Sequence, residues 1–160
     1  MNLELVDLDL PPETNIIVGH SHFIKTVEDL YEVMVGTVPG IEFGLAFCEA
    51  SGDCLIRTEG NSDELIQASV NNARAVGAGH SFFILMKNAY PINVLNGVKS
   101  CQEVCRIFCA TANPVQVVVT RTDQGAAILG VVDGESPRGV ENAEHQAKRK
   151  QLLQAIGYKR

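Results

Sequence analysis

The chain has 160 residues, 46% of them hydrophobic and 20% charged, which is the size and composition of one globular domain spanning residues 1–160. No apolar run approaches the roughly eighteen residues of a membrane span, and the N-terminus lacks a secretory signal, so we expect a cytoplasmic protein with no membrane partner. The formal net charge of −6 and the lack of Trp argue against a nucleic-acid partner, whose phosphates favour clustered Lys and Arg.

The first half of the chain predicts alternating strands and helices. The N-terminal part predicts a strand-like stretch, a short strand, a turn and a helix, in the order Met1–Leu10, Asn15–Val18, Gly19–His22 and Thr26–Val35. Thr26 is expected to cap its helix. A hairpin, a helix and a buried strand follow, namely Ile41–Cys48 with Cys54–Thr58, Asn61–Val76, and Ser81–Met86. The pair Gly77 and Gly79 ends the second helix, because glycine adopts the left-handed conformation there.

The second half predicts a connector, a helix, a hairpin and a last helix, namely Pro91–Asn96, Lys99–Ala110, Val115–Thr120 with Ala126–Val132, and Glu141–Ile156. Hairpins interleaved with helices predict an α+β (mixed α/β) domain. Its sheet is expected to be mixed but mostly antiparallel, with helices on both faces. Residues 41–48, 81–86 and 115–119 are apolar on both faces, so these strands are expected at the centre, with helices on both sides.

The five cysteines favour a structural interpretation. Cys101, Cys105 and Cys109 have helical spacing, which predicts one buried apolar stripe and disfavours a metal centre, since no Cys-x-x-Cys occurs. Cys48 and Cys54 flank the first hairpin loop and come together if the strands pair. A reducing cytoplasm disfavours a structural disulfide between them.

His80 is the first candidate for chemistry. It follows Gly77-Ala-Gly79, a turn whose backbone N–H groups can form a small anion nest. An imidazole beside such a nest can act as a base or accept a phosphoryl group. The local residues alone favour the plainer interpretation, a helix C-cap followed by a strand-edge histidine.

A second cluster precedes the first helix and contains His20, His22 and Lys25. Helix N-termini attract phosphate, so these side chains are candidates for phosphate binding, and a solvated loop is an equal alternative. His-x-His also suggests a metal, but no third ligand is near in sequence.

Two further groups are less specific. The polar set Asn93, Asn96, Lys99 and Asn113 fits either turn formation or recognition of a base edge or ribose hydroxyl. Glu49, Asp53, Asp133 and Glu135 lie in loops where most acids are solvated. Asp133 precedes Gly134, where a carboxylate can hold Mg²⁺ beside phosphates.

Several segments together resemble one family. They are His22-Phe-Ile-Lys-Thr-Val-Glu-Asp-Leu-Tyr31, Phe43-Gly-Leu-Ala-Phe-Cys-Glu-Ala-Ser-Gly52, Gly77-Ala-Gly-His80, Pro91-Ile-Asn-Val-Leu-Asn96, Ala110-Thr-Ala-Asn-Pro114, Gly130-Val-Val-Asp-Gly134 and Gly157-Tyr-Lys159. In this order the chain is similar to the adenosine-specific kinase family over nearly its whole length.

The resemblance implies a homotrimer that binds adenosine or AMP and carries phosphate on a histidine. His80 matches that role best, with His22 as the rival assignment. His20 stands where the family pattern suggests Gln, and Ala126-Ala127 where it suggests Arg-Gly. Loss of such an arginine weakens stabilisation of a moving phosphoryl group.

The sequence therefore supports two hypotheses. In the first, the protein transfers a phosphoryl group from a donor such as ATP to adenosine through His80. His22, Lys25, Gly79, Asn93, Asn96, Lys99 and Asn113 bind the substrate, and Asp133 or Glu49 holds Mg²⁺. In the second, the protein is a sensor that holds AMP without turnover.

Overall fold

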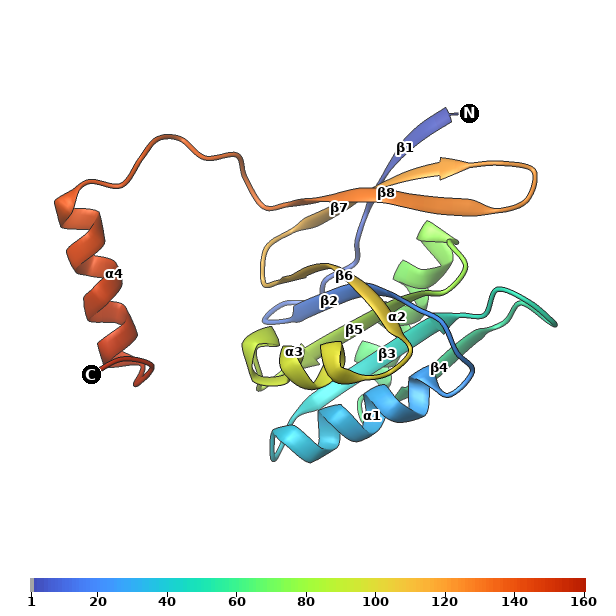
Figure 1. Ribbon diagram of the computed structural model, residues 1–160, viewed down its shortest axis with the longest axis horizontal. Helices are drawn as coiled ribbons and strands as arrows, with labels where there is room; N and C mark the ends of the chain where they lie inside the picture. The colour runs from blue at the N-terminus through green and yellow to red at the C-terminus, as the bar shows by residue number, and fades with distance from the viewer. Residues whose placement is uncertain (1) are drawn as a thin grey trace.

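The computed structural model describes residues 2–160 and contains eight strands and four helices within that range (Figure 1). In chain order they are β1 (Asn2–Asp7), β2 (Asn15–Ser21), α1 (Thr26–Thr37), β3 (Glu42–Cys48), β4 (Ile56–Gly60), α2 (Asp63–Val76), β5 (Ser81–Lys87), α3 (Pro91–Ser100), β6 (Val104–Thr111), β7 (Val115–Arg121), β8 (Ala126–Asp133) and α4 (Ala143–Ala155). Met1, the first residue of the predicted N-terminal stretch, lies outside the described residues.

A five-stranded sheet forms the centre of the fold, in the order β4-β3-β5-β2-β6 with every neighbouring pair antiparallel. The three inner strands β3, β5 and β2 are almost entirely buried, as their uninterrupted apolar sequences require. The predicted central positions of 41–48 and 81–86 are thus confirmed.

The two faces of this sheet are covered differently. Leu30 and Met34 of α1, with Val94 and Val98 of α3, pack on the face that carries Phe82, in one hydrophobic cluster. Helix α2 and a second, three-stranded sheet cover the opposite face in a separate cluster. The molecule is therefore an α+β fold with helices on both faces, as the sequence predicts.

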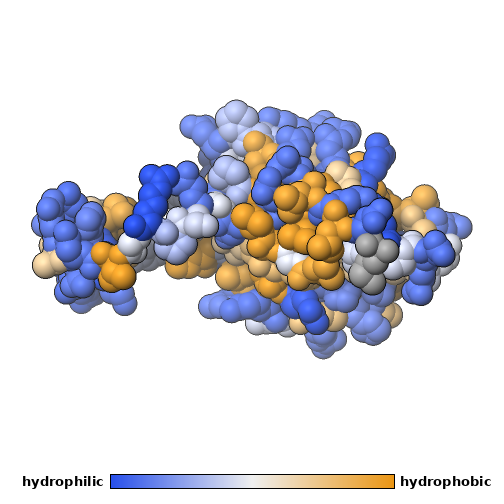
Figure 2. Space-filling view, turned by 90° about the horizontal axis from the view of Figure 1, so that it is seen from above, coloured by the Kyte–Doolittle hydropathy of each residue, from blue (hydrophilic) through white to orange (hydrophobic). Residues whose placement is uncertain are grey.

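The second sheet has the order β1-β7-β8 and is also antiparallel. Val115, Val117 and Val119 of its middle strand point inward and join the cluster beneath. Its other face carries exposed leucines, seen as an orange area in the view from above (Figure 2). Beyond β8 the chain leaves the body, and α4 has no buried residue.

The largest error of the sequence analysis concerns residues 91–111. The predicted connector Pro91–Asn96 begins helix α3, where Pro91 occupies the first turn and the side chain of Asn93 accepts from the N–H of Tyr90. The predicted helix Lys99–Ala110 instead becomes mainly strand β6, because β2 needs a hydrogen-bonding neighbour on its second edge. The predicted helical stripe of Cys101, Cys105 and Cys109 therefore does not exist.

Two smaller predictions near the first helix are also wrong. Residues 19–21 of the predicted turn Gly19–His22 continue strand β2, since β6 pairs with all three and β5 pairs with Gly19 and His20. Thr26 does not cap α1. Its hydroxyl donates to the carbonyl of Phe23 at 2.6 Å, and Lys25 occupies the N-cap position.

The contact between β3 and α2 depends on Gly44, because a Cβ at that position would overlap the backbone of Leu65 and Ile66. We expect Gly44→Ala to lower the free energy of unfolding by about 3 kcal/mol, the upper range for overpacking. Urea denaturation at fixed protein concentration measures this. The matched control is Gly36→Ala in α1, whose Cβ meets nothing within 4 Å. It should be neutral or stabilising, and equal losses in both variants would contradict the explanation.

Strand β6 can be tested by cysteine reactivity. The strand exposes Cys105 and buries Cys109, whose thiol pKa is raised to about 11, mainly by burial. A thiol reagent at pH 8 should therefore modify Cys54 and Cys105 quickly and Cys109 only on unfolding. Peptide mass spectrometry identifies the modified residues. Equal rates at Cys105 and Cys109 would contradict the strand.

Candidate functional site

His80 occupies a strained turn between α2 and β5. Helix α2 ends at Gly77, which is left-handed with φ of 64° as predicted, and His80 is left-handed too, with φ of 62°. That conformation costs a non-glycine residue roughly 1–2 kcal/mol. The N–H of His80 donates to the carbonyl of Cys48, and its carbonyl accepts from the N–H of Ser21, both at 2.8 Å. Two strand ends therefore hold the turn in place.

The same turn offers fewer donors than the sequence suggests. The N–H of Gly77 donates to the carbonyl of Ala73 at 2.8 Å, so it and the N–H of His80 are already used. Gly79 is needed for close packing, since a Cβ there would lie 2.9 Å from the Cβ of Ala50. The predicted anion nest therefore loses at least two of its donors.

Three imidazoles meet at this end of the sheet. The ring of His80 is stacked on Phe47, with centroids 5.8 Å apart and planes within 14°. Its centroid lies 6.1 Å from that of His20 and 6.4 Å from that of His22. The structure therefore joins the two histidine clusters that the sequence presents separately.

His20 lies in an environment that disfavours its charged form. Burial lowers the pKa of its imidazole below 6.5, and the nearby His80 and Arg106 lower it further. At pH 7 the ring is therefore neutral and able to accept a proton or act as a nucleophile.

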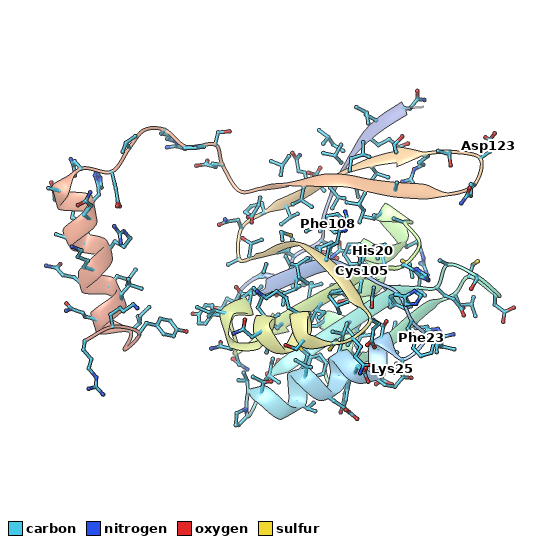
Figure 3. All side chains as sticks on the ribbon, viewed as in Figure 1. His20, Phe23, Lys25, Cys105, Phe108 and Asp123 are labelled. Atoms are coloured by element: carbon cyan, nitrogen blue, oxygen red, sulfur yellow. The ribbon has the colours of Figure 1, made fainter. Side chains whose placement is uncertain are left out.

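Two adjoining cavities open beside this cluster. The smaller, of about 330 Å³, is bordered by His20, Arg106 and Phe108 together with the start of β8. The larger, of about 720 Å³, is bordered by Arg74, Glu49 and the loop before β8. Gly79, Ala126 and Ala127 border both, so we treat the two as one feature, the β8 hollow. In Figure 3 His20 and Phe108 lie between the two sheets.

The arginines of the β8 hollow lack carboxylate partners. Four other arginines form ion pairs with glutamates, namely Arg57, Arg121, Arg138 and Arg149. Among residues 2–160, Arg74 and Arg106 form no ion pair at all. Two uncompensated guanidinium groups at one hollow of an acidic protein favour an anionic ligand.

The predicted site residue Lys25 does not have a free ammonium group for binding an anionic ligand. Its ammonium lies 2.6 Å from Asp29 and 3.6 Å from Glu103, whose carboxylate is almost fully buried. The hydrogen bond to Asp29 raises the pKa of Lys25 above its usual value. Figure 3 shows Lys25 near the start of α1, apart from His20. Lys25 therefore compensates two carboxylates.

The other predicted substrate-binding residues lie elsewhere. Asn93, Asn96 and Lys99 are exposed on α3, where Asn93 accepts from the N–H of Tyr90 at 2.8 Å. Asn113 follows β6 and donates to Asp133 at 3.1 Å. None of these four borders the β8 hollow.

The two predicted Mg²⁺ ligands are far apart. Glu49 borders the larger cavity but binds Arg57 at 2.7 Å, and that hydrogen bond lowers the pKa of its carboxyl. Asp133 is the last residue of β8, at the end opposite Ala126, so roughly 20 Å of strand separates it from the hollow. The residues present do not form a shared magnesium site, and residues 2–160 contain no cluster of three or more metal-binding side chains.

A third cavity, of about 930 Å³, lies at the other end of the sheet, beside Asn15, Lys87 and Tyr90. It contains none of the histidines.

Among the described residues no helix is long and apolar enough to cross a membrane.

Sequence reasoning missed Arg74, Arg106 and Phe108. Arg106 and Phe108 were hidden by the assignment of residues 99–110 to a helix. The alternation of small, charged and apolar residues in Val104-Cys-Arg-Ile-Phe-Cys-Ala-Thr111 is the signal that could have indicated the strand. Arg74 carries no signal of its own, since a basic residue in the last turn of a helix is common.

A cluster of three histidines therefore lies beside a hollow bordered by two arginines that form no ion pair among residues 2–160. The model of a family described as adenosine specific kinase matches residues 6–159, and the chain belongs to that family. Among solved structures, it is similar to the PH1918 protein from Pyrococcus horikoshii OT3, with 44% identity and a TM-score of 0.95. The match covers 99% of this chain and 98% of that one. No curated protein matches the chain.

The charge state of His20 is measurable by NMR titration. We expect its pKa to lie below 6.5 and to rise in Arg106→Gln, because a positive neighbour is removed while burial remains. In the unfolded chain His20 has the higher pKa, so it takes up its proton at a higher pH than in the folded protein. The free energy of unfolding therefore decreases as the pH falls below about 6.5. An unchanged or lower pKa in the variant would show that Arg106 does not act on His20.

Proposed function

We propose that the protein transfers a phosphoryl group to adenosine, with a histidine of the cluster as the carrier. The observation that supports this most strongly is the pair Arg74 and Arg106, without carboxylate partners, at a hollow that His20 also borders. This arrangement matches a ligand with negative charge beside a neutral imidazole, and the family description agrees with it.

His80 is our assignment for the carrier. Its ring lies next to both other imidazoles, and the left-handed backbone and Phe47 fix its orientation. A neutral ring nitrogen of His80 attacks the terminal phosphorus of ATP, a nitrogen–phosphorus bond forms, and ADP leaves. His20, neutral and adjacent, accepts the proton that the imidazole loses.

In the second half of the reaction, the phosphoryl group passes from His80 to a nucleoside. A hydroxyl of adenosine attacks the phosphorus, the nitrogen–phosphorus bond breaks, and AMP forms as the hydroxyl proton leaves. Phe108 and Ile128 give the smaller cavity an apolar side suited to a purine ring. Mg²⁺ enters as part of the substrate Mg-ATP, since Glu49 and Asp133 lie at opposite ends of β8.

A nucleotide sensor is the second candidate. Ala126 and Ala127, where the family resemblance suggests Arg-Gly, border both cavities and offer no charge to a moving phosphoryl group. On this alternative AMP binds at Arg74 and Arg106 without turnover. The homotrimer that the resemblance implies belongs to either candidate.

Intact-protein mass spectrometry after incubation with Mg-ATP tests the proposal. We expect an acid-labile adduct of one phosphate that His80→Ala abolishes and that adenosine discharges as AMP. An adduct that persists in His80→Ala but is lost in His20→Ala or His22→Ala would move the carrier to that residue. A histidine variant that loses the adduct but retains AMP as wild type does would show that the substituted residue acts in phosphoryl transfer and not in AMP binding.

The control is His145→Ala in the exposed helix α4, which should keep the full adduct. Arg106→Gln should reduce adduct formation by about 10²-fold, the typical effect of removing one group that stabilises developing charge. An unmodified wild-type protein that still retains AMP would favour the sensor.

A further inference from the structure

The orientation of His80 depends on where helix α2 ends. The helix closes at Val76, and His80 follows shortly after it, in the turn that Gly77 begins. Beyond His80 the chain enters β5, which is fixed by its pairing with β2 and β3. The end of α2 is therefore the part of the molecule whose displacement would move the His80 ring most directly.

Arg121 of β7 donates hydrogen bonds to the end of this helix. Its Nη1 lies 3.2 Å from the carbonyl oxygen of Val76, and its Nη2 lies 3.0 Å from that of Ala75. The last carbonyls of a helix have no partner within the helix, so these two are free to accept. Figure 1 shows the last turns of α2 beneath β7 and β8. One planar guanidinium thus bridges two successive carbonyls, which restrains the helix end in both position and direction.

A carboxylate holds the remaining side of the same guanidinium. The Nε of Arg121 donates to Glu4 of β1 at 2.8 Å. Glu4 pairs with Val119 of β7, so the carboxylate and the guanidinium come from neighbouring strands of one sheet. Because the guanidinium is a rigid fork, a bond at Nε orients the two Nη groups. The second sheet therefore fixes the direction from which Arg121 reaches α2.

The turn that follows α2 packs closely against Arg121. A Cβ added at Gly77 would lie 3.3 Å from the Nη1 of Arg121, so little space separates the two. Arg121 also pairs with Ala126, the first residue of β8, and Ala126 forms a parallel bridge with Ala78 in the turn. The backbone groups that bind His80 belong to strands of the central sheet. The turn is thus held between the two sheets, and Arg121 makes side-chain contacts to it from the second.

Arg121 borders neither cavity of the β8 hollow, so it acts on a ligand only through other groups. We propose that Arg121 is a positioning residue, which fixes the end of α2 and thereby aims the imidazole of His80 at the terminal phosphate of a bound nucleotide. The proposal rests on the proposed function, which makes His80 the phosphoryl carrier. A displacement of about 1 Å at a reacting group can cost about 10²-fold in rate, so loss of this restraint should slow the transfer.

The test substitutes Arg121 in the full-length protein and follows the phosphate adduct over time at several Mg-ATP concentrations. Arg121→Met removes all the hydrogen bonds of the guanidinium and keeps an unbranched side chain. The matched control is Arg149→Met, because Arg149 also binds a glutamate at 2.7 Å but belongs to the exposed helix α4. A second control, Val94→Ala, removes buried methyl groups of α3, so it lowers stability without touching the turn.

We expect Arg121→Met to lower the rate of adduct formation at saturating Mg-ATP by about 10²-fold. The half-saturating ATP concentration and the retention of AMP should stay at wild-type values. Arg121→Lys should recover part of the rate, since an ammonium donates to one carbonyl but does not reproduce the fork. A protein that is merely less stable forms less adduct at an unchanged rate, as we expect of Val94→Ala.

An unchanged rate in Arg121→Met, or an equal loss of rate in Val94→Ala, would overturn the proposal. So would a raised half-saturating ATP concentration at an unchanged rate, because it would make Arg121 a binding residue.

Amide hydrogen exchange measured by NMR tests the positioning without phosphoryl transfer. The N–H of His80 should exchange faster in Arg121→Met than in wild type, relative to the N–H of Ile84 within β5. General destabilisation accelerates both amides together, so the two controls should keep the wild-type ratio. A wild-type protein that forms no adduct would contradict the proposed function, and the exchange ratio would then decide the role of Arg121. An unchanged ratio in Arg121→Met would overturn that role.

Discussion

Burial of the central sheet on both faces is the constraint on which the rest of this structure depends. Strands β2, β3 and β5 are apolar on both sides because α1 and α3 cover one face while α2 and the second sheet cover the other. Polar chemistry is thereby excluded from the middle of these strands. It is confined to their ends, and His20, Ser21 and His80 all lie at one end.

The second sheet converts that end into a site. The start of β8 and His20 border one hollow between two layers of strands. The parallel bridge between Ala78 and Ala126 ties the turn before His80 to the start of β8. Packing of the second sheet and the shape of the hollow are therefore coupled, and the valines of β7 support both.

The sequence predicted the parts of the fold whose local pattern agrees with their tertiary role. The hairpins, the α2 cap at Gly77 and the buried strand β5 followed from turn residues and apolar runs. Residues 91–111 did not, because β6 forms through pairing with a strand some ninety residues earlier, which local periodicity does not report. The wrong helix assignment at residues 99–110 also affected the prediction of the site. His80 and His22 were recognised, whereas Arg106 and Phe108 became visible only when the strand placed them beside His20.

The distribution of charge has a kinetic consequence. Residues 1–133 contain seven Lys or Arg and sixteen Asp or Glu, a formal charge of −9. A polyphosphate is therefore repelled at long range even though Arg74 and Arg106 attract it at contact. Ionic strength near that of a cell limits electrostatic reach to about 8 Å. The repulsion then fades while the short-range attraction in the hollow persists. Added salt should therefore accelerate the encounter of an anionic nucleotide with this protein, the reverse of what a basic surface produces.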